Sequence, residues 1–139
     1  MKKLLSPLVV ALALVGGSSA RGWAAEPLAT GDIPFAFHAA GNTLPAGKYD
    51  ILLENAQSNV LVVRDDGTKK TIFVPFTTRL AARNYDNAEL IFDKDPNGLY
   101  LSEIFVGHSD GYFIPGAPGR HTHEHVKATQ AGKAPEKKQ

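Results

Sequence analysis

The sequence predicts an all-β fold: a single small antiparallel β-barrel or β-sandwich of six to seven strands, with an N-terminal signal peptide and a disordered C-terminal tail. Short apolar runs separated by turn residues recur at regular spacing from residue 32 onward, which is typical of strands joined by hairpins. No apolar pattern is long enough for a helix that would cover a sheet, so the sheet must fold on itself. The 139 residues suffice for one domain.

The first residues have the three-part layout of a secretory signal peptide. Two lysines follow the initial methionine, residues 4–17 form an almost uncharged apolar run, and Ala20 ends a group of small residues. The apolar run is shorter than the about 20 residues that a membrane-spanning helix needs. We therefore expect residues 1–20 to be removed on export to the periplasm or the extracellular space, with cleavage after Ala24 as the alternative. Residues 21–31 are expected to form a linker.

The first strand is predicted at residues 33–39. Alternation places Ile33, Phe35 and Phe37 on one face of it. Pro34 has no N–H to donate to a ladder, so this end is expected at a sheet edge or at the start of the strand.

Turn residues then set the next strands. Pro45 and Gly47 suit the second and fourth positions of a tight turn. A strand follows at residues 49–54, where apolar and acidic side chains alternate as in a strand with one wet face. Another is predicted at residues 59–64, and Gly67 closes the hairpin after it, because glycine adopts the positive φ that such loops need.

The remaining strands are predicted at residues 70–76, 89–94, 99–106 and 111–114. Between them, residues 77–87 are expected to form a loop with one helical turn at 80–83, and Asp-Pro-Asn-Gly at 95–98 is a strong turn signal. The β-domain thus spans residues 32–115. Residues 116–139 are rich in Gly, Pro, Ala, Lys and Gln, a composition that predicts a disordered tail. The core is expected to contain Phe35, Phe37, Ile51, Val74 and Phe92.

The runs DIPFAFHAAGNTLPAGKYDI, AELIF and LYLSEIF resemble a group of small exported bacterial β-domains. In that group a phenylalanine-rich first strand precedes an L-P-A-G-x-Y turn, and a later strand reads close to Y-L-S-E-I. Here these pieces are Phe35 and Phe37, residues 44–49 and residues 100–104. The resemblance covers residues 32–106 and implies export and an all-β fold. The group has no assigned activity, so no catalytic residue is carried over.

The amino-acid composition and charge of the chain exclude several kinds of site. The chain has no cysteine, which excludes disulfides, thiol nucleophiles, Cys-based zinc sites and a lipid attached through cysteine. Residues 21–119 carry 8 basic and 12 acidic residues, a net charge of −4, whereas residues 120–139 carry 5 basic and 2 acidic residues, a net charge of +3. A mildly acidic domain with a basic tail lacks the clustered Lys and Arg of a nucleic-acid-binding surface.

The candidate metal ligands are His121, His123 and His125, in the segment GRHTHEHVKA. Alternate residues of an extended chain point the same way. Three imidazoles would then face one ion, and imidazole suits Zn, Cu and Ni. The competing interpretation is a solvated tail, because a disordered segment supplies no partners that fix the rings.

Three other groups of residues suggest chemistry. Residues 93–98 match the first half of a calcium loop, but Ile104 stands where the bidentate Glu is needed, so a hairpin turn is favoured. Residues 108–110 read His-Ser-Asp, yet consecutive residues cannot form a hydrolase triad. Glu103 alternates with apolar residues; an ion pair with Arg64, Arg79 or Arg83 is favoured over a catalytic role with an aspartate such as Asp93.

We therefore expect an exported, non-enzymatic β-domain that acts as a binding or structural module of the bacterial cell envelope. Its partner would be an unknown envelope component or a small ligand, with no nucleic acid and no transmembrane segment after signal cleavage. One alternative is a periplasmic metal-binding protein that uses the H-x-H-x-H tail, with Zn, Cu or Ni as its ion and no other cofactor. The second alternative is an uncharacterised hydrolase.

Overall fold

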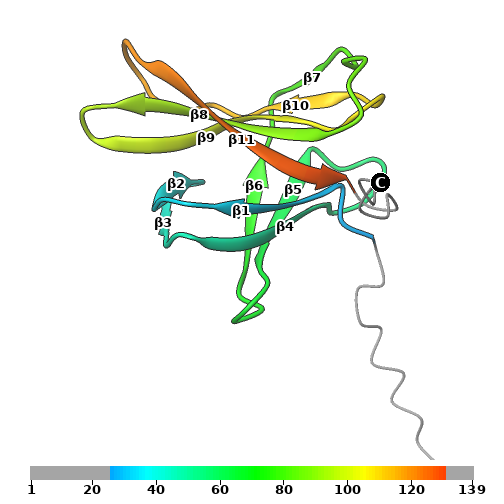
Figure 1. Ribbon diagram of the computed structural model, residues 1–139, viewed down its shortest axis with the longest axis horizontal. Coiled ribbons are helices and arrows are strands. Elements are labelled where there is room, and N and C mark those ends of the chain that lie inside the picture. The colour runs from blue at the N-terminus through cyan, green and yellow to red at the C-terminus, as the bar shows by residue number, and fades with distance from the viewer. Residues whose placement is uncertain (1–25, 131–139) are drawn as a thin grey trace, which may run out of the picture.

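The structure is a computed structural model that describes residues 26–130. The expected signal peptide and the end of the expected tail lie outside these residues. Eleven strands and no helix occur within residues 26–130 (Figure 1). They are β1 (Ala29–Ile33), β2 (Phe37–Ala39), β3 (Asn42–Leu44), β4 (Gly47–Leu53), β5 (Val60–Asp65), β6 (Thr71–Pro75), β7 (Thr78–Leu80), β8 (Ala88–Asp95), β9 (Gly98–Phe105), β10 (Gly111–Phe113) and β11 (Thr122–Gln130). The all-β prediction is confirmed, and the strand number exceeds the predicted six to seven.

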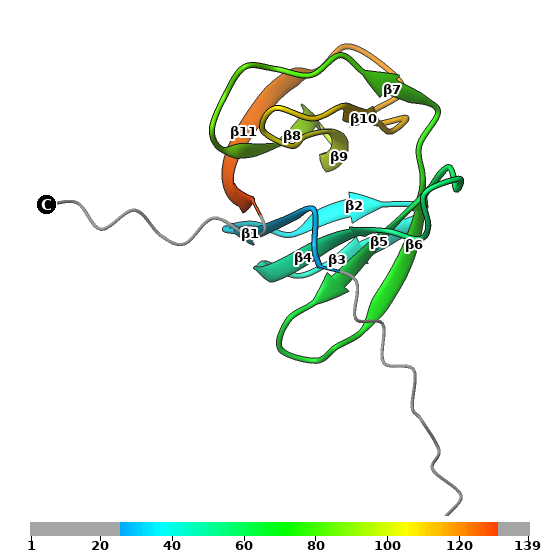
Figure 2. The same cartoon turned by 90° about the vertical axis from the view of Figure 1, so that its right-hand side faces the viewer.

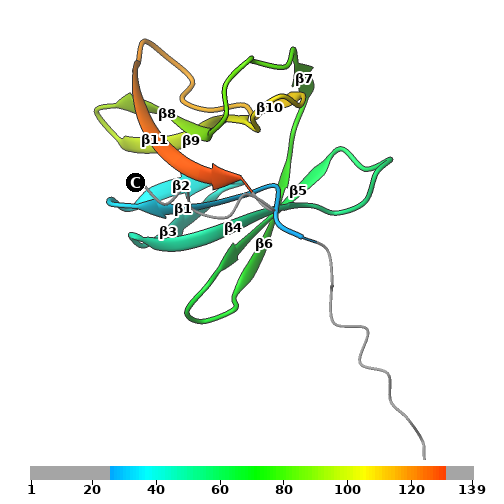
Figure 3. The ribbon, with the colours of Figure 1, turned by 45° about the vertical axis from the view of Figure 1, so that its right-hand side comes forward.

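The strands form one curled sheet in the order β3-β2-β9-β8-β11-β1-β4-β5-β6, and β10 links β7 to β9. Neighbours pair antiparallel except β2 and β9, which pair in parallel. Figures 2 and 3 show two layers, with β8, β9 and β10 in one and β1, β4, β5 and β6 in the other. β11 crosses from the first layer to the second, because it pairs with β8 along most of its length and with β1 at its end. It is the strand that joins the layers.

Three local expectations were wrong. The expected strand at 33–39 is split: β1 ends at Ile33, where Pro34 interrupts the ladder, and β2 starts at Phe37 in pairing with other strands. In place of the helical turn at 80–83, residues 78–80 form β7, which pairs with β10.

The third correction concerns the two expected ends of the domain. β1 begins at Ala29, inside the expected linker, and residues 122–130 of the expected disordered tail form β11. Both segments are ordered by pairing, since Ala29 lies opposite Gln130 in the β1–β11 ladder. The folded part therefore extends beyond residues 32–115 at both ends.

An aromatic cluster fills the space between the layers. The Phe37 ring lies edge-on to the rings of Tyr49 and Phe92, with centroids 5.2 and 5.4 Å apart, and Phe35 packs edge-on to Phe92 at 5.0 Å. The predicted core residues Phe37, Ile51, Val74 and Phe92 are buried, and Phe35 is partly buried against them. Within residues 26–130 no helix is long and apolar enough to span a membrane.

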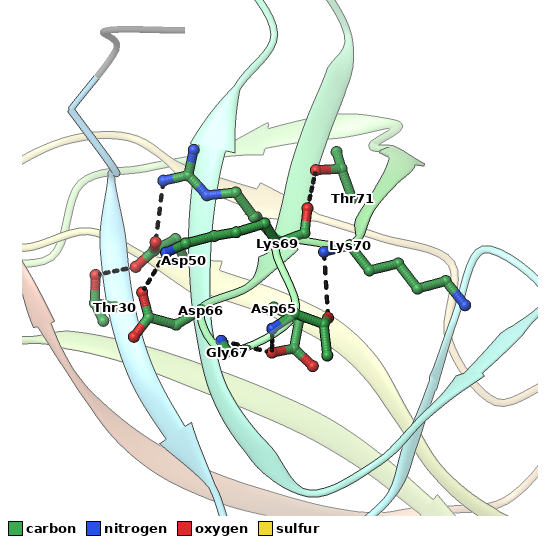
Figure 4. A network of polar contacts seen from close by, with 10 residues as sticks. Thr30, Asp50, Asp65, Asp66, Gly67, Lys69, Lys70 and Thr71 are labelled. Carbon is green, nitrogen blue, oxygen red and sulfur yellow. Dashed lines mark hydrogen bonds and ion pairs between the residues drawn. The ribbon is translucent and has the colours of Figure 1, made fainter. Parts of the chain in front are cut away.

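The outer face of β1, β4 and β5 carries a polar network (Figure 4). The register sets Thr30 opposite Asp50, and Asp50 opposite Arg64. Thr30 donates a hydrogen bond of 2.8 Å to Asp50, and Arg64 forms an ion pair of 3.0 Å with the same carboxylate. At the β5–β6 hairpin, the hydrogen bond from Lys69 is the main cause that lowers the pKa of Asp66. Asp50, expected on a wet face, is thus buried and paired.

Replacing Tyr49 by phenylalanine tests one polar contact of the core. The Tyr49 hydroxyl donates a hydrogen bond of 2.6 Å to the Pro45 carbonyl, so the variant is expected to lose about 1 kcal/mol of unfolding free energy at neutral pH. Burial, helped by the charge of Asp65, raises the pKa of the Tyr49 phenol above its ordinary value of 10.0. The protonated phenol therefore stabilises the fold below about pH 10, and that stability is lost as the pH rises through the folded-state pKa.

The measurement is the melting temperature of wild type and Tyr49→Phe between about pH 8 and about pH 11. The wild type should lose more stability than the variant over the alkaline part of this range. Tyr112, whose pKa burial also raises, remains in both proteins and accounts for a residual loss. Equal alkaline losses in the two proteins would contradict the assignment to Tyr49.

Candidate metal centre

The β8–β11 ladder brings a carboxylate and a histidine together. Val126 and Ala128 of β11 face the core, so the alternate residue His123 faces outward on the other side of the strand. The register sets His123 directly opposite Asp93 of β8. His121, which immediately precedes β11, reaches the same point. The Asp93 carboxylate and the imidazoles of His121 and His123 offer three ligand atoms that lie within 4.8 Å of one another.

Asp93 is buried because the segment that leads from β10 to β11 crosses over it. The Ala117 N–H donates a hydrogen bond of 3.2 Å to Asp93 Oδ2. The segment can approach so closely because residue 116 is glycine: a Cβ there would lie 2.2 Å from Asp93 Oδ2. One carboxylate oxygen is thus held by the backbone. The other, Oδ1, faces the two histidines, 3.4 Å from His121 Nε2 and 3.2 Å from His123 Nδ1.

A backbone contact selects the tautomer of a neutral His121. Its Nδ1 lies 2.7 Å from the Gly119 carbonyl, which only accepts hydrogen bonds, so Nδ1 carries the proton. In the neutral imidazole, Nε2 then presents a lone pair toward Asp93 Oδ1. Such an arrangement is favourable when a cation, either a proton or a metal ion, lies between the two atoms. A backbone carbonyl on the far nitrogen is also the usual partner of a metal-ligating histidine.

The distances from the carboxylate oxygen to the two imidazole nitrogens match those of a metal site. Two ligands of a tetrahedral zinc ion at about 2.1 Å lie about 3.4 Å from each other. The distances from Asp93 Oδ1 to the two imidazole nitrogens are 3.4 and 3.2 Å. The rings of His121 and His123 stand nearly perpendicular, with centroids 5.1 Å apart and an interplanar angle of 79°. Two of the three separations therefore fit a tetrahedral ion, and the third, between the two imidazole nitrogens, is within 4.8 Å.

The third predicted ligand, His125, does not join this group. Its Nδ1 contacts the Glu89 carboxylate, which belongs to the other end of β8. The sequence predicted one ion bound by all three histidines, with Asp93 in the strand at 89–94 and at the start of the turn motif at 93–98. The structure instead groups His121 and His123 with Asp93. The sequence signal for Asp93 was the alternation of Glu89, Ile91 and Asp93 along one face of a strand. The strand that pairs with this one, β11, was not predicted.

The other candidates have structural partners. Residues 95–98 form the predicted hairpin turn, in which Asp95 Oδ1 accepts hydrogen bonds from the N–H groups of Asn97 and Gly98. His108 Nε2 contacts Asp86 at 3.0 Å, and the Ser109 N–H bonds to the Val106 carbonyl. His108 and Ser109 thus lie in a turn and do not form a nucleophile–base pair with each other.

Glu103 lacks the arginine partner that was expected for it. Arg64 pairs with Asp50, Arg79 lies over the rings of Phe76 and Tyr112, and Arg83 lies over the ring of Phe105. Among the ion pairs of residues 26–130, none involves Glu103, which is half-buried. The predicted ion pair of Glu103 was therefore wrong.

Comparisons of the chain with protein-family models, with curated proteins and with solved structures give no match.

Proposed function

We propose that this protein is a non-enzymatic β-domain that binds one divalent transition-metal ion through Asp93, His121 and His123. The observation that carries the proposal is the convergence of three ligand atoms, one from a buried carboxylate held by the Ala117 N–H and one from a histidine held by the Gly119 carbonyl. Such outer contacts orient ligands before the ion arrives, which reduces the cost of binding.

The donor set selects the class of ion. Two imidazoles and one carboxylate suit zinc, copper and nickel better than calcium or magnesium, which prefer oxygen ligands alone. Three protein ligands leave a fourth position for water or for another small ligand. We favour binding over catalysis because the side chain of His123 is half-exposed on an outward face, whereas active sites usually lie in concave pockets that surround the substrate.

Export is part of the proposal. Its support is the sequence pattern of residues 1–20, with a basic start, an apolar run and small residues at its end. An exported domain without cysteine that carries a histidine-based site would bind transition metals outside the cytoplasm. The sequence predicts a binding module without identifying its ligand, and we propose the metal ion as that ligand.

The test is a titration of the metal-free protein with zinc, copper and nickel by calorimetry, with the bound metal counted by elemental analysis. We expect one ion per chain. The substitutions His121→Ala, His123→Ala and Asp93→Asn should each weaken binding by more than about tenfold, because the first two remove an imidazole ligand and the third removes the charge of the carboxylate. The matched control is His125→Ala, which removes a neighbouring histidine from the same strand and should leave the affinity unchanged.

Two results would contradict the proposal. If His125→Ala weakens binding as much as His121→Ala while Asp93→Asn has no effect, the ion is held by the histidine repeat alone. If the four variants bind like the wild type, the ion is held elsewhere. Circular dichroism of each variant establishes that the fold is retained.

A further inference from the structure

A second group of charged side chains surrounds a hollow of about 390 Å³ beside the other end of β8 and β11. Its lining includes Arg83, Tyr85, Asn87, Glu89, His125 and Lys127. The volume lies within the range of about 300 to 1,000 Å³ that is usual for pockets that bind small molecules. This hollow contains the histidine that the metal centre leaves out.

The charges around the hollow are unbalanced. Glu89, its acidic residue, is in contact with His125. Within residues 26–130, neither Arg83 nor Lys127 has a carboxylate within 4.0 Å. Lys127 lies opposite Glu89 in the β8–β11 ladder, but that carboxylate contacts His125, so the hollow has two cationic side chains and one carboxylate that already has a partner. The hollow is suited to a ligand that brings negative charge.

Arg83 is held in place before any ligand arrives. Its guanidinium carbon lies 3.4 Å from the centroid of the Phe105 ring, a stacking contact that fixes the plane of the group. Its carbonyl accepts a hydrogen bond of 3.1 Å from the His108 N–H, which anchors the backbone. A guanidinium that is stacked by one face keeps its N–H edge free to bind a carboxylate or phosphate with two parallel hydrogen bonds.

The rim of the hollow offers an aromatic surface. Tyr85 is 61% exposed, which is a large fraction for an aromatic side chain, and it lines the same hollow as the two cations. A flat organic group that packs against the phenol ring would bury apolar surface on both partners. The anionic group and the flat body of one ligand can thus be bound at the same time.

We propose that this hollow binds a small organic anion, with a carboxylate or phosphate group between Arg83 and Lys127 and a flat body against Tyr85. The site is separate from the metal centre and does not depend on it, since it shares none of Asp93, His121 and His123.

The experiment titrates the metal-free full chain with benzoate and phenyl phosphate, followed by calorimetry and by amide chemical shifts of residues 83–89 and 125–127. We expect saturable binding of at least one probe, at one molecule per chain. Acetate and inorganic phosphate, which lack the ring, should bind at least tenfold more weakly. Benzoate carries a carboxylate and phenyl phosphate carries a phosphate, so the tighter of the two probes identifies which anionic group the hollow prefers.

Variants separate a built site from general attraction by positive charge. Arg83→Lys keeps the charge but loses the planar fork, and Lys127→Gln removes the second cation; each should weaken binding at least tenfold. Lys70→Gln removes a lysine from the opposite layer and should change nothing. The proposal is overturned if neither probe saturates, if Arg83→Lys and Lys127→Gln bind like the wild type, or if inorganic phosphate binds as tightly as phenyl phosphate.

Discussion

Replacing Val126 by aspartate is expected to lower the free energy of unfolding by about 3 kcal/mol or more, because it leaves an unpaired charge in the core. Val126 is 9% exposed, belongs to the core cluster, and lies opposite Leu90 in the β8–β11 ladder. No cationic side chain belongs to the core cluster in the described part of the chain, so the new carboxylate would be unpaired. A change of this size removes a large share of the stability of a small domain.

The measurement is urea unfolding followed by far-ultraviolet circular dichroism. The matched control is Thr122→Asp, which adds the same carboxylate to an exposed position at the start of β11 and should change the stability by less than about 0.5 kcal/mol. The pair also tests whether residues 122–130 are folded. A disordered tail would tolerate both substitutions equally, and equal stabilities would contradict the place of β11 between the layers.

The contrast at Val126 explains which elements could be predicted. The runs around Ile51, Val74 and Phe92 have several apolar residues in alternation, and each of these predicted core residues is buried. β11 buries only Val126 and Ala128 among nine residues, so its alternation is too weak to distinguish it from a polar tail. What orders it is pairing on both sides, with β8 and with β1, and that depends on the sheet topology.

The same reason limits prediction of the metal centre. The spacing of His121, His123 and His125 correctly indicated side chains on one side of an extended segment. The register of β11 against β8 determines which carboxylates the histidines contact. The observed register sets His123 opposite Asp93 and lets His125 reach Glu89. Local sequence does not encode a register between distant segments. Asp93 was therefore predicted in the strand at 89–94 and in the turn motif at 93–98, and not beside the histidines.

The second prediction of large effect concerns Gly116. This residue lets the crossing segment, which leads from β10 to β11, lie on Asp93. In Gly116→Ala, the new Cβ would lie 2.2 Å from Asp93 Oδ2 and 3.0 Å from Ser102 Cβ, so the segment or the carboxylate must move. Overpacking of this kind costs about 1 to 3 kcal/mol. Losing the hydrogen bond from the Ala117 N–H to a charged oxygen adds about 1.5 to 3 kcal/mol. We expect a total loss of about 3 kcal/mol or more.

Two readouts make the Gly116→Ala result specific. Thermal unfolding of the metal-free protein measures the loss of stability, and a zinc titration at a temperature where the variant is folded measures the affinity. We expect the affinity to fall by about tenfold to a hundredfold, because the buried carboxylate loses the contact that orients Oδ1 toward the histidines. The control is Gly119→Ala in the same segment, where an added Cβ meets no atom within 4 Å and the carbonyl that holds His121 is kept.

The combination of outcomes separates the fold from the site. If Gly116→Ala lowers the stability but not the zinc affinity, the crossing segment stabilises the domain without organising the metal centre, and the pre-orientation of Asp93 is not what favours binding. If it changes neither, the close approach of residue 116 to Asp93 does not exist in solution. If Gly116→Ala lowers both the stability and the zinc affinity, and Gly119→Ala lowers neither, the burial of the Asp93 carboxylate contributes to the fold and to the metal centre. This is the expected result, since β11 and the segment before it contribute to both the sheet and the metal centre.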